Sequence, residues 1–347
     1  MPALMSRSEL KSVVHTATLA PSVLNIQPWH FVARPDGVVE LHRDPRRSLP
    51  LLDPRHRELT VSCGAALFNL RLAIAVAGRL PEVQLMPEGS QTSLLATVRA
   101  VERMAPSSTD VRLFGTISRR RTSRWPFVNL PIAPEMIMRL ESVATIERAI
   151  LRVLDSGEAA YAAGLVHRAD AAQRSDPAVC AELARWTNRE VDAVDGIPTP
   201  ALGPAPRDPS SLVRDFAMGG PVHRRRVADF EPDPTLAVLL TEGDEPADWL
   251  RAGQALERVW LEATAAGLAV SLLTQPLEVS QLRWLGRPLA PLGARPVGPS
   301  FPDAASWSGP RVWPQVLLRV GNALDSTPPT PRRPVDDVLT LASPGPL

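Results

Sequence analysis

The sequence predicts an α+β protein made of two tandem halves, with long buried helices and antiparallel sheets. Segments 64–78 and 253–267 align without a gap at a constant offset of 189 residues, and six of their fifteen positions are identical. Both segments end in a glycine and are followed by short apolar runs. Two helices rich in alanine and leucine can also match by chance, but the shared glycine stop favours a duplication.

The first half, residues 1–112, begins with a helical pattern that stops before Pro21, because proline disfavours a helical residue in front of it. A Pro-Asp-Gly turn signal at 35–37 lies between two β-prone runs and predicts a hairpin. The segment that ends at Gly78 is apolar on nearly every face and predicts a helix buried on all sides. The expected elements are a helix over 8–19, a hairpin of 31–33 and 38–42, the buried helix 57–77, and strands 83–86 and 96–101.

The second half, residues 113–347, contains the second copy of the long helix and expected strands at 270–273 and 316–320. In front of that helix, residues 196–234 are rich in proline and glycine and have little periodicity. Loops longer than about 15 residues are usually disordered or functional lids. Apolar residues such as Ile197 and Phe216 indicate that part of this segment packs on the protein, so we expect a lid-like insert.

Composition narrows the class of protein. A chain of 347 residues with 44% apolar residues can fill two cores, and a formal net charge of +1 gives no long-range attraction to nucleic acid or to an anionic membrane. Cys63 and Cys180 have no spacing typical of a disulfide framework, and the six histidines lack metal-ligand spacing. We find no apolar leader segment and therefore expect a cytoplasmic protein without a metal and outside the membrane.

The segment from Arg119 to Phe127 is the first candidate site. It places four arginines within six residues next to two hydroxyl side chains, Thr122 and Ser123. Forked guanidinium donors and short hydroxyl donors together suit a phosphate. The arginine pair at 332–333, in the proline-rich tail, could bind the same anion. The alternative is a solvated basic loop.

The second candidate site is the loop from Ala20 to Trp29. Two prolines stiffen it, and Ser22, Asn25 and Gln27 present hydroxyl and amide groups from that frame, as a planar heterocycle with donors and acceptors would need. Alternatively, these groups only satisfy the backbone of the loop. The third candidate is 273–279, where a backbone bend could point N–H groups at a ligand; its alternative is a plain turn from strand to helix with an acidic residue at the helix N-terminus.

Together the three segments resemble the nitroreductase superfamily, and in particular its Acg-type branch of fused, FMN-associated proteins. Residues 21–29 are similar to the loop of that family that contacts the isoalloxazine ring, and residues 120–124 resemble its Arg-x-Ser/Thr-x-Arg/Lys phosphate motif. Residues 276–278 resemble the loop whose backbone faces flavin N5, and 332–333 occupy the position of the C-terminal phosphate-binding residues. The resemblance implies a nitroreductase-like fold in which the two halves form a pseudo-dimer.

The resemblance also implies the cofactor and its residues. Arg124 is expected to tune the flavin near N1, with the backbone amides of Glu278 and Val279 facing N5. The expected FMN-binding residues are Pro21, Ser22, Val23, Asn25, Gln27, Arg120, Arg121, Thr122, Arg124, Pro276, Leu277, Glu278, Arg332 and Arg333. Because the ring loop and the phosphate motif each occur once, we expect a single FMN per chain, in a monomeric pseudo-dimer or a weak homodimer.

Two functions remain open at the level of sequence. One is an NAD(P)H-dependent oxidoreductase that passes electrons through FMN to nitroaromatic or quinone-like acceptors. The other is a protein that sequesters or stores FMN under the insert with little or no turnover. A serine hydrolase that uses Ser22 or Ser62 is disfavoured, because the chain has no Gly-x-Ser-x-Gly elbow.

Overall fold

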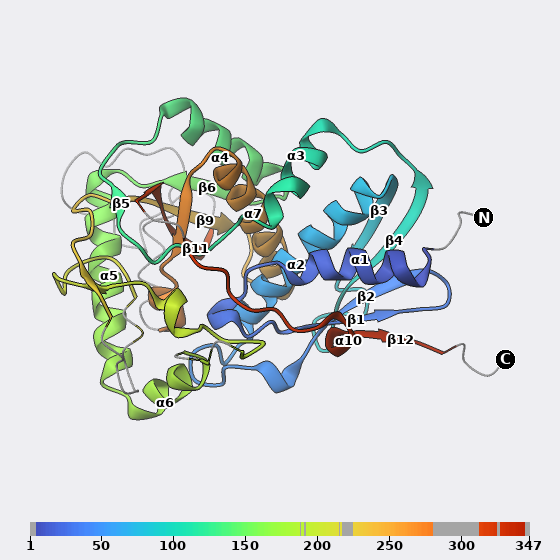
Figure 1. Ribbon diagram of the computed structural model, residues 1–347, viewed down its shortest axis with the longest axis horizontal. Coiled ribbons are helices and arrows are strands. Elements are labelled where there is room, and N and C mark those ends of the chain that lie inside the picture. Colours follow the sequence, from blue (N-terminus) through green and yellow to red (C-terminus); the bar gives the residue numbers. More distant parts are fainter. Residues whose placement is uncertain are drawn as a thin grey trace.

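Two sheets and a central pair of helices organise the chain in a computed structural model (Figure 1). The structure describes residues 5–187, 189–190, 192–214, 216, 225–279, 312–324 and 327–343. The helices are α1 (Arg7–Thr18), α2 (Arg57–Val76), α3 (Ser108–Ile117), α4 (Pro134–Ile146), α5 (Ser156–Arg174), α6 (Pro177–Trp186), α7 (Pro246–Ala265), α8 (Gln275–Glu278) and α10 (Val335–Val338). Short 3-10 turns lie at Val23–Asn25, Pro45–Arg47 and Thr199–Leu202.

The first sheet has the strand order β12-β1-β2-β4-β3. Its members are β1 (Trp29–Ala33), β2 (Val38–Arg43), β3 (Arg79–Leu85), β4 (Leu94–Arg103) and β12 (Leu339–Leu341). All pairs are antiparallel except β1 with β12, which is parallel. The end of the chain therefore returns to the first half, and Figure 1 shows this red segment running from β11 across to β1.

The second sheet has the strand order β10-β11-β9-β6, and β5 pairs with the C-terminal end of β11. Its members are β5 (Phe127–Val128), β6 (Ile150–Val153), β9 (Thr235–Thr241), β10 (Ala269–Leu272) and β11 (Trp313–Ala323), all in antiparallel pairs. A two-stranded ribbon of β7 (Ala205–Pro206) and β8 (Val227–Ala228) lies in the insert. The chain is thus α+β, as the sequence predicted.

Local sequence explains where the helices begin and end. Ser6 and Asp155 accept hydrogen bonds from backbone N–H groups in the first turns of α1 and α5, and a glutamate three residues later completes a capping box in each case. Gly78 and Gly267 follow the two long helices with φ of +79° and +81°, a left-handed conformation that glycine adopts without steric cost.

Helices α2 and α7 pack against each other through glycine. Both are 20 residues long, and they begin at positions separated by the same offset of 189 that relates the two repeat segments. A Cβ placed on Gly253 would lie 2.7 Å from Cα of Gly64, and against the carbonyl oxygen of Val61; a Cβ on Gly64 would meet the carbonyl oxygen of Leu250. Val61 and Leu250 are themselves 189 residues apart, and each packs in the core of the opposite half.

The structure confirms the main sequence predictions of secondary structure. The hairpin forms with Gly37 at φ +83°, the buried helix spans α2, and the strands expected at 83–86, 96–101, 270–273 and 316–320 fall within or overlap β3, β4, β10 and β11. The expected boundary between residues 112 and 113 falls inside α3. Of the insert at 196–234, residues 215 and 217–224 lie outside the described residues.

By length and composition, α2 is apolar enough to cross a membrane, but 89% of its apolar window is buried inside the protein. Every residue of the helix is buried except Arg71 and Val76, which are half-buried. It is therefore the core helix around which the first half is built.

We predict that Gly253→Ala destabilises the protein by roughly 1–3 kcal/mol, because the added methyl group must push two helix backbones apart. Chemical denaturation measured by circular dichroism tests this. Gly115→Ala in α3 is the matched control: nothing lies within 4 Å of its added Cβ, so this variant should be neutral or slightly more stable. Equal stability of the two variants would contradict the close packing.

Candidate functional site

Two adjoining pockets lie where the halves meet. The first, which we call the inner pocket, encloses about 850 Å³ of space between atoms, part of which is open to solvent. The second, which we call the arginine pocket, has about 740 Å³. Pro21, Ser22, Thr122 and Arg124 line both pockets, so the two are continuous along these side chains.

The inner pocket takes its walls from both halves and from the insert. The first half contributes the loop at 21–24 and one side of α2, and the second half contributes residues of α7, β10 and β11. Besides the loop and the residues shared with the arginine pocket, the lining residues are Arg57, Glu58, Val61, Ser62 and Ala65 of α2; Ile197, Val213, Arg214 and Phe216 of the insert; and Leu256, Ser271, Leu272, Thr274, Gln315 and Val316. Most of this surface is apolar, with a few polar groups at fixed places, which suits a flat organic ligand.

The arginine pocket collects cations from distant parts of the chain. Arg120, Arg121 and Arg332 line it together with Asn25. Nη1 of Arg120 and Nε of Arg332 are buried and have no hydrogen-bond acceptor among the described residues, whereas Nε of Arg120 lies 3.5 Å from Oε1 of Glu257. Buried donors without acceptors are costly, so these two groups fit an anion that would accept from them.

The pKa values of these arginines record the same crowding. Burial, reinforced by the neighbouring positive charges of Arg120 and Arg121, lowers the pKa of Arg332 to about 9. Burial also lowers the pKa of Arg120, against the attraction of Glu257, and lowers that of Arg121. Bringing several like charges together out of water costs free energy, and a bound anion would offset that cost.

The proline-framed loop adopts a strained backbone. Leu24, Asn25 and Gln27 have φ of 46°, 55° and 50°, a left-handed conformation that costs roughly 1–2 kcal/mol for each residue that is not glycine. Hydrogen bonds hold the loop in place: the N–H of Val23 donates to Oγ of Ser62 on α2 at 3.1 Å, and the N–H of Gln27 donates to Oγ of Ser22 at 3.0 Å. Such strain is typical of functional sites, where the surroundings fix an unusual geometry.

The two amide side chains of this loop form hydrogen bonds with other protein groups and do not line the inner pocket. Nδ2 of Asn25 donates to the carbonyl oxygen of Gly196 at 2.8 Å, and its Oδ1 accepts from Arg332 at 3.0 Å. Asn25 therefore joins the insert and the tail at the edge of the arginine pocket. Gln27 is fully buried, lines neither pocket, and uses both ends of its amide on the backbone of Val194 and Arg333. The expectation that Gln27 contacts a ligand is corrected: its position inside the loop leaves no polar atom for one.

The segment at 120–124 is fixed to the second sheet. The N–H of Ser123 donates to the carbonyl oxygen of Val270 at 2.9 Å, next to a bridge between Thr122 and Val270. This places Thr122 and Arg124 at the junction of the two pockets. Arg124 donates to the carbonyl oxygen of Ala201 at 2.9 Å, and burial lowers its pKa to about 10. It therefore remains a cation at neutral pH.

The expectation for residues 276–279 needs correction. The N–H groups of Glu278 and Val279 donate to the carbonyl oxygens of Thr274 and Gln275, at 3.2 and 3.3 Å, because the segment forms the short helix α8. They are not available to a ligand, and none of Pro276, Leu277, Glu278 and Val279 lines either pocket. The contribution of this segment to the inner pocket is instead Thr274.

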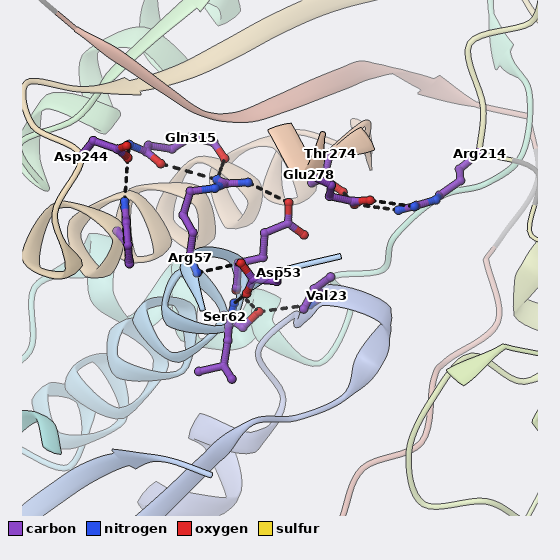
Figure 2. Close-up of polar contacts among 12 residues, drawn as sticks. Val23, Asp53, Arg57, Ser62, Arg214, Asp244, Thr274, Glu278 and Gln315 are labelled. Carbon is purple, nitrogen blue, oxygen red and sulfur yellow. Dashed lines mark hydrogen bonds and ion pairs between the residues drawn. The ribbon is translucent and has the colours of Figure 1, made fainter. Parts of the chain in front are cut away.

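Glu278 has a different role, as the anchor of the insert. Its carboxylate accepts two hydrogen bonds from Arg214, both at 2.8 Å, and one from Thr274 at 2.7 Å (Figure 2). A further hydrogen bond comes from Gln173 at 2.6 Å. Despite burial, the Arg214 guanidinium keeps the pKa of Glu278 below its usual value. Arg214 belongs to the insert and lines the inner pocket, so this ion pair holds the insert over it.

The two arginines of the tail separate. The guanidinium of Arg332 lies in the arginine pocket, where it also donates to the carbonyl oxygens of Leu19 and Ala20 at 3.2 and 3.1 Å. Arg333 turns away and donates to the carbonyl oxygens of Gln27 and Asp337, at 3.4 and 3.0 Å. The expected phosphate contact of Arg333 is therefore corrected, because neighbouring residues of an extended segment point to opposite sides.

Sequence reasoning missed the polar wall that α2 gives to the inner pocket. Arg57 and Glu58 are only 3% and 5% exposed, and Nη2 of Arg57 donates to Oε1 of Glu58 at 2.8 Å. Arg57 also donates to the carbonyl oxygen of Gln315 on β11 at 2.5 Å, a contact visible in Figure 2. Two charges at the start of a helix that is otherwise apolar on all faces were the available signal, since burying them requires partners.

Among the described residues, no group of three or more His, Cys, Asp or Glu side chains could hold a metal ion. The polar atoms of the site are mainly guanidinium, hydroxyl and amide groups, which suit an anionic organic ligand.

Comparisons with known proteins agree with this picture. A protein of Mycobacterium tuberculosis named "Putative NAD(P)H nitroreductase Rv3131" is 33% identical over 335 residues, which cover 95% of this chain and 90% of the relative. The protein "Putative NAD(P)H nitroreductase acg" of the same organism is 31% identical over 334 residues, covering 95% of each chain. No family model matches the sequence.

Among solved structures, the FMN and NADPH-dependent nitroreductase NfnB from Sphigopyxis sp. strain HMH aligns with 67% of this chain and 99% of its own. The identity is 16% and the TM-score 0.36, so the family assignment rests on the sequence relatives. The chain is an α+β protein with two continuous pockets, one of them lined by arginines, between residues 1–112 and 113–347. By its relatives, the chain belongs to the nitroreductase superfamily, in the Acg branch, which confirms the resemblance predicted from the motifs.

We predict that Arg214→Met destabilises the protein by roughly 3–5 kcal/mol, because it leaves the buried carboxylate of Glu278 without its cation. Thermal or chemical unfolding measures this. Arg207→Met, in the same insert, removes an exposed ion pair with Asp229 and should change stability little. A small effect of Arg214→Met would show that the pair does not hold the insert.

We also predict a pH dependence from Glu257, which faces Arg120 from α7. Burial raises its pKa to about 7 from 4.5, so the folded protein binds this proton more tightly than the unfolded chain does. The contribution of Glu257 to the free energy of unfolding is therefore largest below pH 4.5 and declines as the pH rises to about 7. The stability of Glu257→Gln relative to wild type should therefore increase across this window and stay constant above it. A difference independent of pH, in denaturation measured from pH 4.5 to 8, would refute the prediction.

Proposed function

We propose that the two pockets together bind one FMN, with the ring in the inner pocket and the phosphate in the arginine pocket. The observation that carries this is a pair of buried arginine groups, Nη1 of Arg120 and Nε of Arg332, that have no acceptor in the part of the chain that the structure describes, beside an apolar pocket that shares four lining residues with theirs. Arg120, Arg121 and Arg332 would hold the phosphate, and Thr122 with the loop at 21–25 would hold the ribityl chain and ring.

Bound FMN would supply the electron chemistry, as cofactors do in such proteins. The chain's own contribution is position and charge. Arg124, a buried cation at the junction of the two pockets, would stabilise the negative charge that two-electron reduction places on the ring. The apolar walls from Val213, Phe216 and Leu256 would exclude water from it.

We further propose that the two halves, 1–112 and 113–347, form an intrachain pseudo-dimer with one such site. The contact of Gly64 with Gly253, and the exchanged contacts of Gly64 with Leu250 and of Gly253 with Val61, support this, since residues related by a two-fold axis contact one another in exchanged pairs. The protein would then act as a monomer or a weak homodimer, in the cytoplasm.

The activity we propose is that of an NAD(P)H-dependent oxidoreductase that reduces nitroaromatic or quinone-like acceptors. The names of the relatives from Mycobacterium tuberculosis support the reaction class, and the inner pocket supports a flat acceptor or nicotinamide beside the ring. One observation favours a second function, FMN sequestration: Ile197, Val213, Arg214 and Phe216 of the insert already line the pocket, held by a buried ion pair.

An anaerobic experiment separates the two functions. The protein is loaded with FMN, NADPH is added without oxygen, and the flavin absorbance is followed. Bleaching within seconds to minutes supports the oxidoreductase. Bound flavin that stays oxidised supports sequestration, and failure to bind FMN contradicts both.

We predict that Arg121→Ala weakens FMN binding roughly ten- to a hundred-fold, because a charge-assisted hydrogen bond contributes roughly 1.5–3 kcal/mol. Quenching of flavin fluorescence during titration measures the Kd. Arg119→Ala is the matched control, since its side chain lies outside both pockets and donates toward Thr116.

Riboflavin, which lacks the phosphate, provides a second control on the ligand side. Its affinity should be nearly the same for wild type and Arg121→Ala. An equal loss of FMN and riboflavin binding would place Arg121 at the ring and contradict the phosphate assignment.

A further inference from the structure

The inner pocket contains a buried carboxyl group that the proposed FMN site leaves without a role. Glu58 lies in the first turn of α2, is 5% exposed and lines the pocket. Its Oε1 accepts from Arg57 at 2.8 Å, whereas its Oε2 is buried and has no hydrogen-bond partner in the described part of the chain. A carboxylate oxygen in this position would be costly, but a hydroxyl there would be an available donor.

The other charges around Glu58 show which carboxyl group carries a proton. The groups that face it are Asp53 and Arg57 beside it, Glu278 on α8 and Arg214 in the insert. All are buried, and with every carboxyl group ionised these five groups carry three negative and two positive charges. The half-buried Asp170, which also faces Arg214 and Glu278, adds to the negative charge. A proton on one carboxyl group reduces this excess and so lowers the cost of a net charge out of water.

Hydrogen bonds decide where that proton resides. Asp53 accepts from the N–H groups of Arg57 and Leu59, both at 2.8 Å, and Glu278 accepts from Arg214 at both oxygens. Both carboxylates are therefore stabilised in the ionised form. Of Asp53, Glu58 and Glu278, only Glu58 has an oxygen that lacks a donor among the described residues. In agreement, burial and the negative charge of Glu278 raise the pKa of Glu58 well above its usual value, against the attraction of Arg57.

Comparison of the two halves indicates that the fold does not require this group. Helices α2 and α7 begin at equivalent positions, 189 residues apart, and the residue of α7 that corresponds to Glu58 is Ala247. The carboxyl group is thus present on one side of the pseudo-symmetric pair, and that side lines the inner pocket.

We propose that Glu58 is a neutral carboxylic acid that donates a proton to the electron acceptor bound in the inner pocket. This rests on the proposed oxidoreductase function. Reduction of a quinone to a hydroquinone takes a hydride equivalent, for which NAD(P)H is the source, and one further proton. The O–H bond at Oε2 breaks as an O–H bond forms on the acceptor, and the resulting Glu58 carboxylate keeps Arg57 as its ion partner until water returns the proton.

The protonation state is tested first, without cofactor or turnover. The infrared spectrum of wild type at pH 8 should contain a carboxylic acid C=O band that shifts in D2O and is absent from Glu58→Gln. Glu257→Gln serves as the control, because it removes a carboxyl group outside both pockets and should leave the band at pH 8 in place. If Glu58→Gln removes no such band, Glu58 is ionised and the proposal is wrong.

Proton delivery is tested with two acceptors of different chemistry. Benzoquinone needs a proton with its electrons, and ferricyanide takes an electron alone. Glu58→Gln should slow the oxidation of the reduced holoprotein by benzoquinone roughly 10²- to 10⁴-fold, the usual effect of a general acid, and leave oxidation by ferricyanide unchanged.

Equal rates of wild type and Glu58→Gln with benzoquinone would overturn the proposal. Equal loss with both acceptors would mean that the substitution damages the site rather than proton transfer, and would also overturn it. A wild-type protein that accepts no electrons from NADPH fails in the proposed oxidoreductase function itself, and the infrared band then decides by itself whether Glu58 is neutral.

Discussion

The close approach of α2 and α7 is the contact on which the rest of the structure depends. Gly64 and Gly253 allow the two helix backbones to touch. Leu250 then packs in the core of the first half, and Val61 packs in the core of the second half. Because this packing fixes the two sheets relative to one another, it also sets the width of the inner pocket, whose walls come from α2, α7 and β11. Small changes of side-chain volume at this contact should therefore alter the width of the inner pocket.

Buried charge is the second organising feature. The inner pocket is bordered by Arg57 with Glu58 and by Arg214 with Glu278, and the arginine pocket is lined by four arginines, of which Arg120 faces the buried carboxyl group of Glu257. Replacing such pairs by apolar side chains is often neutral or stabilising, so stability alone does not account for them. Their positions around two continuous pockets are better explained by a ligand that is flat at one end and anionic at the other.

The arrangement also relates the two candidate functions to each other. The same insert that would seal a stored flavin supplies Arg214 to the charged cluster around Glu58. Both candidate functions therefore depend on the same ion pair between Arg214 and Glu278.

The sequence by itself determined the local features: the hairpin at Gly37, the buried helix, and the two motifs that supply Arg120, Arg121 and the loop from Pro21. These follow from periodicity, backbone preferences and residue chemistry, which act over a few residues. Only the tertiary structure decided that Gln27 and Arg333 bind protein, that the amides of Glu278 and Val279 are used inside α8, and that Glu58 faces the pocket. Those outcomes depend on which distant groups meet after folding, and burial changes both the partners and the protonation of each charged side chain.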